Sequence, residues 1–214
     1  MAAAAGDHQR GPGELEDRRG PSRQEENEEM YFGALPPEII SGKMYAGAGH
    51  DSIYAAARQW KQLFNEMASA PKLFGEALTK LNAQWSGPSA IRMAEAAALY
   101  QEWLYTFVHD IYRTATQAFR LVGAYADARK AVVSPAVIAY NRTRVHELIQ
   151  SDLFGENTVA IAALEAQYQQ FWARDAKAMD TYAANVLDTL STMTPWPKPP
   201  EITETGFAQA SATV

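Results

Sequence analysis

The sequence predicts an all-α protein, an elongated helical bundle built on a long antiparallel hairpin with two shorter C-terminal helices. Apolar residues recur at alternating spacings of four and three over long stretches, which is the periodicity of packed helices. Proline, glycine and serine stand where these stretches begin and end. No stretch alternates polar and apolar residues in the manner of a β-strand.

Two helices open the expected bundle. The first is predicted over 37–45, with Pro37 in its first turn and Gly47-Ala48-Gly49 as its stop signal. Asp51 is expected to cap a longer second helix over 51–85. Pro71 lies on the apolar line of this helix and removes a hydrogen bond, so we expect a kink there. The line runs through Ile53, Ala57, Trp60, Phe64, Met67, Pro71, Phe74, Leu78, Leu81 and Trp85.

The turn Trp85-Ser86-Gly87-Pro88 separates this helix from a third, predicted over 88–132. At 1.5 Å per residue the second and third helices are roughly 50 and 65 Å long. A short turn between two such helices implies an antiparallel hairpin.

Two further helices follow the hairpin. The fourth is predicted over 135–151, because Ser134 is a favourable N-cap and Pro135 follows it at the first helical position. After a tight loop over 152–157, a fifth helix is predicted over 158–190, with Asn157 or Thr158 as its cap.

Composition divides the 214 residues into three segments. Residues 1–29 are rich in glycine, proline and charge, and we expect a disordered acidic extension. Residues 30–190 form the helical domain, and 191–214 form a proline-rich tail that is expected to be flexible. Residues 1–30 hold eight acidic residues against four arginines and so carry most of the net charge of -6. An acidic chain lacks the basic patch that nucleic-acid binding requires.

The sequence offers no catalytic or metal-binding constellation. The absence of cysteine excludes disulfides, thiolate zinc sites and cysteine nucleophiles. His146-Glu147 begins like a zinc-protease motif, but Gln150 stands where the second histidine is required. None of the four histidines follows a glutamate by three positions, as a ferritin-like di-iron site needs. We therefore predict a non-enzymatic protein without metal or cofactor. We also predict no transmembrane segment, because the sequence has no run of 18 apolar residues.

The third helix is apolar over a wide arc, which indicates burial on several sides. Because the other helices are too short to cover the whole hairpin, we expect an open face that binds another protein. One alternative is that the fourth and fifth helices fold back and cover it all. Another is a self-sufficient helical adaptor or homodimer that uses the seam from Ile53 to Trp85.

Six stretches of the chain match, in order, the motifs of one known family. They are Tyr31-Phe32-Gly33-Ala34-Leu35-Pro36-Pro37-Glu38, Met44-Tyr45-Ala46-Gly47-Ala48-Gly49, Trp85-Ser86-Gly87-Pro88-Ser89, Asn141-Arg142, Leu153-Phe154-Gly155-Glu156-Asn157-Thr158 and Phe171-Trp172-Ala173-Arg174-Asp175-Ala176-Lys177-Ala178-Met179. The series resembles the mycobacterial PPE family, named for Pro-Pro-Glu, and Met30 resembles its usual initiator. Where the family usually has Pro-Tyr, this chain has Leu99-Tyr100, so a helix irregularity is expected to be absent.

The resemblance implies a partner and an export route. PPE proteins pair with PE proteins in a heterodimer that ESX type VII secretion systems export, from the cytosol to the cell surface or medium. Residues 1–30 lack the apolar stretch of a Sec signal peptide. Trp85 and Gly87 match the Trp-x-Gly turn of the type VII signal, but no tyrosine has Asp or Glu four positions later, so a partner must supply that half. The predicted PE interface comprises Ile53, Trp60, Phe64, Met67, Trp103, Phe107 and Ile111.

The loop between the fourth and fifth helices resembles the docking site of the cytosolic chaperone EspG. The residues implied are Leu153, Phe154, Gly155 and Asn157. Two apolar side chains at a loop tip would contribute about 3–5 kcal/mol on docking, before association costs. The alternative for this loop is that Phe154 folds inward against the helix ends. The alternative for the export-signal turn is that Trp85 only packs against the end of the hairpin.

Overall fold

A computed structural model describes residues 32–193 and 195–201 of the chain. These residues belong to one compact unit, Phe32–Val214. Every regular element that they form is a helix, which confirms the all-α prediction. The predicted disordered extension, residues 1–29, lies outside the described residues, as does the end of the predicted flexible tail.

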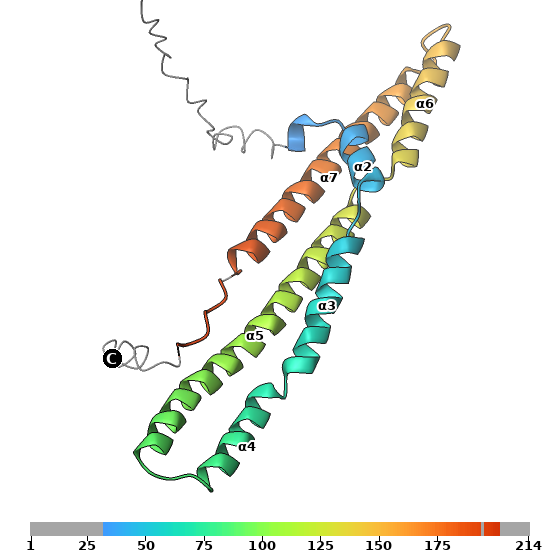
Figure 1. Ribbon diagram of the computed structural model, residues 1–214. Helices are drawn as coiled ribbons and strands as arrows, with labels where there is room; N and C mark the ends of the chain where they lie inside the picture. Colours follow the sequence, from blue (N-terminus) through green and yellow to red (C-terminus); the bar gives the residue numbers. More distant parts are fainter. Residues whose placement is uncertain (1–31, 194, 202–214) are drawn as a thin grey trace, which may run out of the picture. The chain divides into compact units, whose positions relative to one another are not determined.

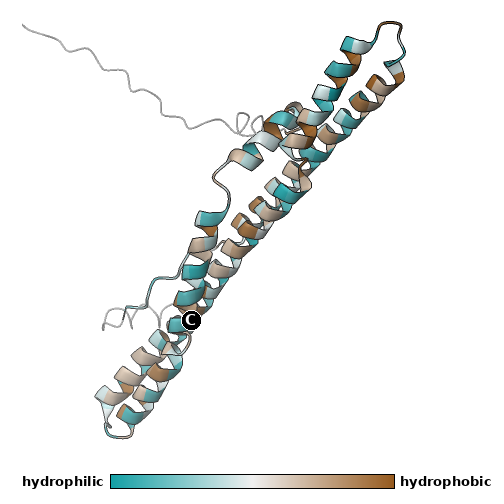
Figure 2. Ribbon diagram, turned by 90° about the vertical axis from the view of Figure 1, so that its right-hand side faces the viewer, coloured by the Kyte–Doolittle hydropathy of each residue, from teal (hydrophilic) through white to brown (hydrophobic). Residues whose placement is uncertain are grey.

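A short 3-10 helix, η1 (Phe32–Ala34), precedes six α-helices in the described residues (Figure 1). α3 and α4 together run antiparallel to α5, and this is the predicted hairpin (Figure 1). α6 and α7 form a second, narrower hairpin that continues beyond the first (Figure 1, Figure 2). The α-helices are α2 (Pro37–Ala46), α3 (Asp51–Met67), α4 (Ala70–Asn82), α5 (Pro88–Ala131), α6 (Pro135–Ser151) and α7 (Thr158–Ser191).

The first arm of the long hairpin consists of two helices, and the prediction of one kinked helix over 51–85 is wrong. α3 ends at Met67 and α4 begins at Ala70. Pro71 accounts for the break, because it has no N–H for the carbonyl of Met67 and its ring would clash with that carbonyl. In the first turn of α4 the missing N–H costs nothing. α4 also ends at Asn82, earlier than predicted.

One of the three predicted N-caps is wrong, and the other two are confirmed in position but make no side-chain bond to their helices. His50 holds the N-cap position of α3, and Asp51 is the first helical residue, where its negative charge still favours the helix dipole. Ser134 and Asn157 hold the N-cap positions of α6 and α7, but neither side chain bonds to its helix. The Asn157 side-chain amide instead donates to the carbonyl of Leu148, 3.0 Å away, because the tight loop turns it toward α6.

α5, with 44 residues, is the central helix of the unit. Leu99-Tyr100 does not interrupt it, as expected. One face packs against α3 and α4, and four buried residues recur there at seven-residue spacing, as in a coiled-coil seam. These residues are Ala90, Ala97, Leu104 and Ile111.

The main apolar cluster lies where α2, α5 and α7 meet; its buried members are Ile40, Met44, Ala128, Val132 and Ala178. Two hydrogen bonds fix the connection between α5 and α6 at this junction. Ser41 Oγ donates to the carbonyl of Val133 at 2.6 Å, and the Val133 N–H donates to Asp175 Oδ1 at 2.7 Å. Side chains from α2 and α7 therefore hold the α5–α6 connection in place.

α7 follows α5 for part of the hairpin. Its side-chain contacts with α5 include Arg120 to Asp188 at 2.9 Å, and Arg113 and Gln117 donate to the carbonyl of Thr192 just beyond its end. The alternative in which the C-terminal helices cover the whole hairpin therefore does not hold, because α7 ends at Ser191, near the middle of α5. The part of the hairpin toward the α4–α5 turn extends beyond it.

Candidate functional site

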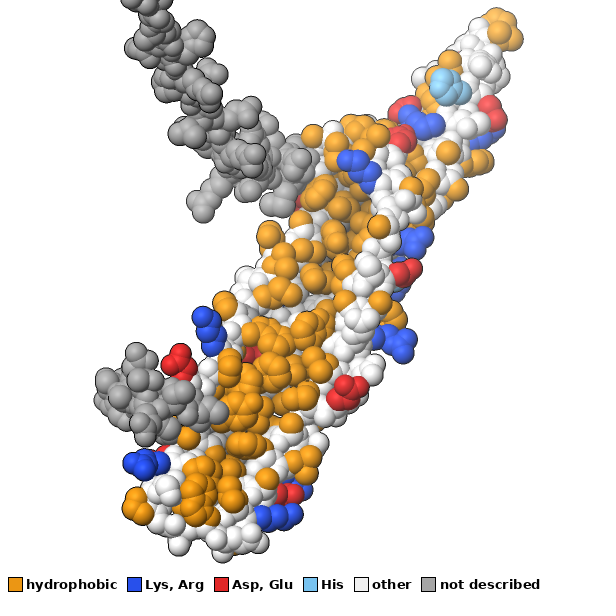
Figure 3. Space-filling model, in the orientation of Figure 1, with side chains coloured by type: hydrophobic (Ala, Val, Ile, Leu, Met, Phe, Trp, Pro, Cys, Tyr) orange, Lys and Arg blue, Asp and Glu red, His pale blue; other side chains and the backbone are white. Residues whose placement is uncertain are grey.

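A row of aromatic side chains continues along the hairpin where α7 ends. Ring centroids of Phe74 and Tyr100 are 5.4 Å apart, those of Tyr100 and Trp103 5.3 Å, and those of Trp103 and Phe107 4.9 Å. Figure 3 shows hydrophobic side chains gathered in a stripe over this part of the molecule. We call this surface the aromatic face; its members are Trp60, Phe74, Tyr100, Trp103 and Phe107.

The chain places one of its own aromatic rings on this face. The ring of Trp196 lies 5.2 Å from that of Trp60 and 5.3 Å from that of Phe107, between centroids. The indole N–H of Trp103 donates to the carbonyl of Pro197 at 2.9 Å. The sequence analysis placed Trp196 in a flexible tail, and no local pattern identified this contact, because it joins distant parts of the chain.

The residues predicted as the PE interface divide between two aromatic clusters. Trp60, Trp103 and Phe107 meet on the aromatic face, whereas Phe64 pairs with Tyr112, centroids 5.1 Å apart. Phe107 and Tyr112 are five positions apart, about 140° around the helix, so the two clusters lie on different sides of α5, while Trp60 and Phe64 are one turn apart on α3. Ile53 is exposed and Met67 half-buried.

Ile111 needs correction as an interface residue. It is completely buried, because it lies on the seven-residue repeat that faces α3. It therefore belongs to the core of the hairpin and presents no surface to a partner.

Several large apolar side chains of the hairpin remain exposed to solvent. Their positions span α4 and the part of α5 nearest the α4–α5 turn. They do not form one patch, because Leu99 and Tyr105 are six positions apart on α5, about 120° around the helix. The residues are Leu73, Leu81, Ile91, Leu99 and Tyr105.

The loop between α6 and α7 carries two of the most exposed apolar side chains in the described residues. Phe154 is 93% and Leu153 78% exposed, so the alternative in which Phe154 folds inward does not hold. Gly155 has a φ of 83°, a conformation that favours glycine. Glu156 Oε2 accepts the Phe154 N–H at 2.8 Å, and Asp152 Oδ1 accepts the Asn157 N–H at 3.0 Å. The loop is thus held by its own polar groups while its apolar side chains point outward.

Two apolar residues at this tip were missed by the sequence analysis. Val159 is 81% exposed in the first turn of α7, and Ile149 is exposed in the last turn of α6. The signal was available: Val159 does not fall on the spacing of Ile161 and Leu164 that marks the packed face of α7. We define the tip as Ile149, Leu153, Phe154 and Val159.

The turn at the opposite end of the hairpin has the geometry that a Trp-x-Gly sequence permits. Gly87 has a φ of 104° and precedes α5, whose Ile91 N–H donates to its carbonyl at 3.2 Å. Trp85 is 38% exposed, so its ring is neither a core residue nor fully free. Packing at the turn and recognition by another protein are therefore compatible.

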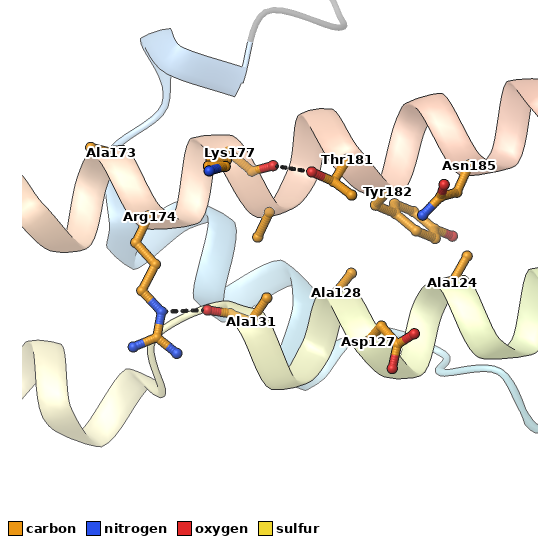
Figure 4. A pocket seen from close by; sticks show the side chains of 11 residues that line it. Ala124, Asp127, Ala128, Ala131, Ala173, Arg174, Lys177, Thr181, Tyr182 and Asn185 are labelled. Atoms are coloured by element: carbon orange, nitrogen blue, oxygen red, sulfur yellow. Dashed lines mark hydrogen bonds between the residues drawn. The ribbon is translucent and has the colours of Figure 1, made fainter.

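A groove of about 620 Å³ lies between α5 and α7 (Figure 4). Alanines form much of its wall, including Ala124, Ala128 and Ala173. Arg174 reaches across one end, where its Nε donates to the carbonyl of Ala131 at 2.6 Å. The small side chains set how closely the two helices approach, and the groove is the space that they leave.

The Pro-Pro-Glu motif joins α2 to α7. Pro36 is the N-cap residue of α2, and Pro37 starts the helix. The hydroxyl of Tyr168 donates to Glu38 Oε2 at 2.8 Å, and the guanidinium of Arg142 lies 4.0 Å from the centre of the tyrosine ring. Burial and the neighbouring Glu38 carboxylate raise the pKa of Tyr168 to about 12. The motif therefore has a clear structural role in this fold.

The described residues hold no group of three or more His, Asp or Glu side chains close enough to bind a metal ion. Nor does any helix in residues 32–193 combine the length and apolarity needed to cross a membrane. The buried ionisable group that stands apart is Asp175, whose Oδ2 has no hydrogen-bond partner. Burial raises the pKa of its carboxyl group, and the bond from Val133 partly offsets this.

The long hairpin, its aromatic face and the exposed tip define an all-helical protein with large uncovered apolar surfaces. The model of the PPE family matches residues 31–194, and the chain belongs to that family. In Mycobacterium tuberculosis, the PPE family protein PPE34 is 42% identical over 173 residues, which cover 80% of this chain and 12% of PPE34. The uncharacterized PPE family protein PPE29 is 43% identical over 185 residues, 86% of this chain and 44% of PPE29.

A third relative from the same organism is named Transporter PPE51. It is 41% identical over 184 residues, which cover 86% of this chain and 48% of PPE51. The chain therefore spans about half or less of the length of these curated relatives.

Proposed function

We propose that this chain is a non-enzymatic PPE protein that forms a heterodimer with a PE protein. An ESX type VII system exports the pair to the cell surface or medium, after an EspG-type chaperone has bound it in the cytosol. Residues 30–190 act as the PPE domain in this proposal. Trp85 and Gly87 provide the Trp-x-Gly half of the export signal, and the PE protein provides the other half.

The observation that carries the proposal is the uncovered apolar surface of a PPE hairpin. α7 stops partway along α5, and beyond it the half-buried rings of Trp103 and Phe107 face outward, with Leu99 exposed one turn away from Trp103. A pair of helices laid against the hairpin would remove this surface from water and gain roughly 25 cal/mol for each Å² buried. The membership in the PPE family supports a PE protein as the source of those helices.

Co-expression tests whether the chain pairs with a PE protein. The chain alone should self-associate at micromolar concentration, because its apolar surface is uncovered, whereas co-expression with a PE protein should give a soluble one-to-one pair. Size-exclusion chromatography with light scattering measures both states. A monodisperse monomer that unfolds cooperatively without a PE protein would contradict the proposal. A stable dimer of this chain alone would instead support the homodimer alternative.

A charged residue at the tip tests whether an EspG-type chaperone binds there. Phe154→Asp should weaken EspG binding by roughly 100-fold or more, about 2.7 kcal/mol, because docking would then bury an unpaired carboxylate. Pairing with the PE protein should not change, since the tip lies at the far end from the aromatic face. Calorimetric titration of the purified pair with EspG measures the affinity.

Tyr140→Asp is the matched control for the chaperone test. It places the same charge on an exposed aromatic position of α6, twelve residues and roughly 18 Å from Asp152. EspG affinity should survive this change. Equal losses from both variants, or an unchanged affinity for Phe154→Asp, would place the chaperone site elsewhere.

A further inference from the structure

Residues 195–200 follow α7 and cross the aromatic face as an extended segment, which we call the strap. Its sequence, Pro195-Trp196-Pro197-Lys198-Pro199-Pro200, contains four prolines. Each proline fixes φ near the value of a polyproline II helix, in which backbone carbonyls are free to accept hydrogen bonds. The ordering of such a segment costs little entropy, because the prolines already restrict it.

The strap and the aromatic face meet in the way that aromatic grooves bind proline-rich peptides. Trp196 is inserted beside Trp60 and Phe107, and the carbonyl of Pro197 accepts the indole N–H of Trp103. Rings that contact the peptide, together with a tryptophan N–H that donates to its backbone, supply affinity for polyproline II segments. The face therefore binds a proline-rich segment, and the chain supplies that segment itself.

The strap is held weakly compared with the helices around it. Trp196 keeps 38% of its surface exposed, and Lys198 and Pro199 are exposed as well. One hydrogen bond and two ring contacts connect it to the aromatic face. Segments with so few buried contacts open locally at low free-energy cost.

The position of the strap matters because it covers surface that a partner would use. If helices of a PE protein extend along the hairpin beyond α7, they meet Trp103 and Phe107 at the point where Trp196 lies. We propose that the strap is an intramolecular placeholder that shields the aromatic face in the unpaired chain and is displaced when the partner binds. This inference rests on the proposed function, because it assigns the displacement to the same partner.

The absence of cysteine allows a direct test. Lys198→Cys gives the full chain a single thiol on an exposed strap residue, which is labelled with a small fluorescent maleimide. Anisotropy at nanomolar concentration reports the mobility of the strap before the chain self-associates. In the unpaired chain the label should be restricted, and adding Trp196→Ala should make it mobile. Equal mobility with and without Trp196→Ala would overturn the shielding role.

A matched label on the hairpin controls for changes in the fold. Lys80→Cys places the dye on an exposed residue of α4, away from Trp196. Its mobility should be the same with and without Trp196→Ala. A change at position 80 would show that Trp196→Ala disturbs the hairpin, and would count against a local strap.

The pair with a co-expressed, cysteine-free PE protein tests displacement. The label at position 198 should become mobile in the pair. If the strap is closed about ten times more often than open, Trp196→Ala should lower the Kd of the pair about tenfold, measured by dilution. A strap that stays restricted in the pair, or an unchanged or higher Kd, would overturn displacement while leaving the pairing itself intact. Failure of both chains to pair would contradict the proposed function and displacement, but the test on the unpaired chain would still decide the shielding role.

Discussion

Asp175 shows how one buried side chain links two helices at a cost. Its Oδ1 accepts the Val133 N–H, so that it satisfies a backbone donor at the α5–α6 connection, while Oδ2 has no partner. Burial raises the pKa of the carboxyl group above its ordinary value. The folded state therefore keeps the proton at pH values where the unfolded chain has released it. For that reason the folded state loses stability, relative to the unfolded chain, as pH rises through this range.

Asp175→Asn tests this sign. The asparagine oxygen can still accept from Val133, but no charge forms, so the variant lacks the pH-dependent cost. The variant should gain stability relative to the wild type between about pH 4 and pH 7, the range above the ordinary Asp pKa. Urea unfolding followed by circular dichroism at several pH values measures the free energy of unfolding.

Asp175→Ala is the control, because it leaves the buried Val133 N–H without an acceptor. It should lose about 1–3 kcal/mol at every pH in that range. The interpretation would be wrong if Asp175→Asn lost stability against the wild type as pH rose. That result would mean that a nearby positive charge stabilises the ionised carboxylate by more than burial destabilises it.

At the scale of single elements, prolines explain both where the sequence predicted helix ends correctly and where it did not. Pro37, Pro88 and Pro135 each lie in a first helical turn, and α2, α5 and α6 begin there as predicted. Pro71 was read as a kink inside one helix, although it also lies in a first turn. The sequence shows which hydrogen bond is lost, but whether the helix bends or restarts depends on how both halves pack against α5. Gln101 on α5, whose side-chain amide donates to the carbonyl of Pro71, is part of that packing.

Pro71→Ala should join α3 and α4 into one helix. Alanine supplies the N–H that can donate to the carbonyl of Met67, and its propensity in a helix interior is about 3 kcal/mol better than that of proline. Part of this gain is lost, because the buried proline ring leaves a space. Hydrogen exchange of the Ala70 and Lys72 amides should slow, and helical circular dichroism should rise slightly.

Pro88→Ala is the matched control for that substitution. Pro88 is the first residue of α5, and the residue four positions earlier, Gln84, is not helical. No hydrogen bond is therefore waiting to form, and the helix content should stay the same. If Pro71→Ala left the exchange of the Ala70 and Lys72 amides unchanged, the contacts with α5 and not the proline would determine the break.

At the scale of the whole described unit, long-range contacts decide what the sequence could not. The pattern predicted an apolar third helix and an open face, but not which apolar residues are inside. Ile111 is buried and Phe107 is half-buried on the surface because α3 and α7 occupy particular sides of α5. The hydrogen bond from Trp103 to Pro197 spans 94 positions, and no local spacing encodes such a contact. Leu153 and Phe154 were predictable, because a short loop between two helices leaves their side chains nothing to pack against, whereas Ile149 and Val159 of the tip were missed.

The distribution of buried residues predicts that stability is concentrated at the junction of α2, α5 and α7. Ile40, Val132 and Ala178 are buried there among several elements, whereas Leu153 and Phe154 at the tip are exposed. Regions with few buried contacts open at a lower free energy than the core, and their amides exchange faster. Hydrogen–deuterium exchange with mass spectrometry on the PE-bound pair should therefore find the slowest amides in 125–132 and 175–182. The tip loop 152–157 and the turn 83–87 should exchange fastest. Partner helices that cover the hairpin should slow exchange in 97–108 but not at the tip. Uniform protection along the chain would contradict the location of the stable core. It would also contradict the separation of the two binding surfaces.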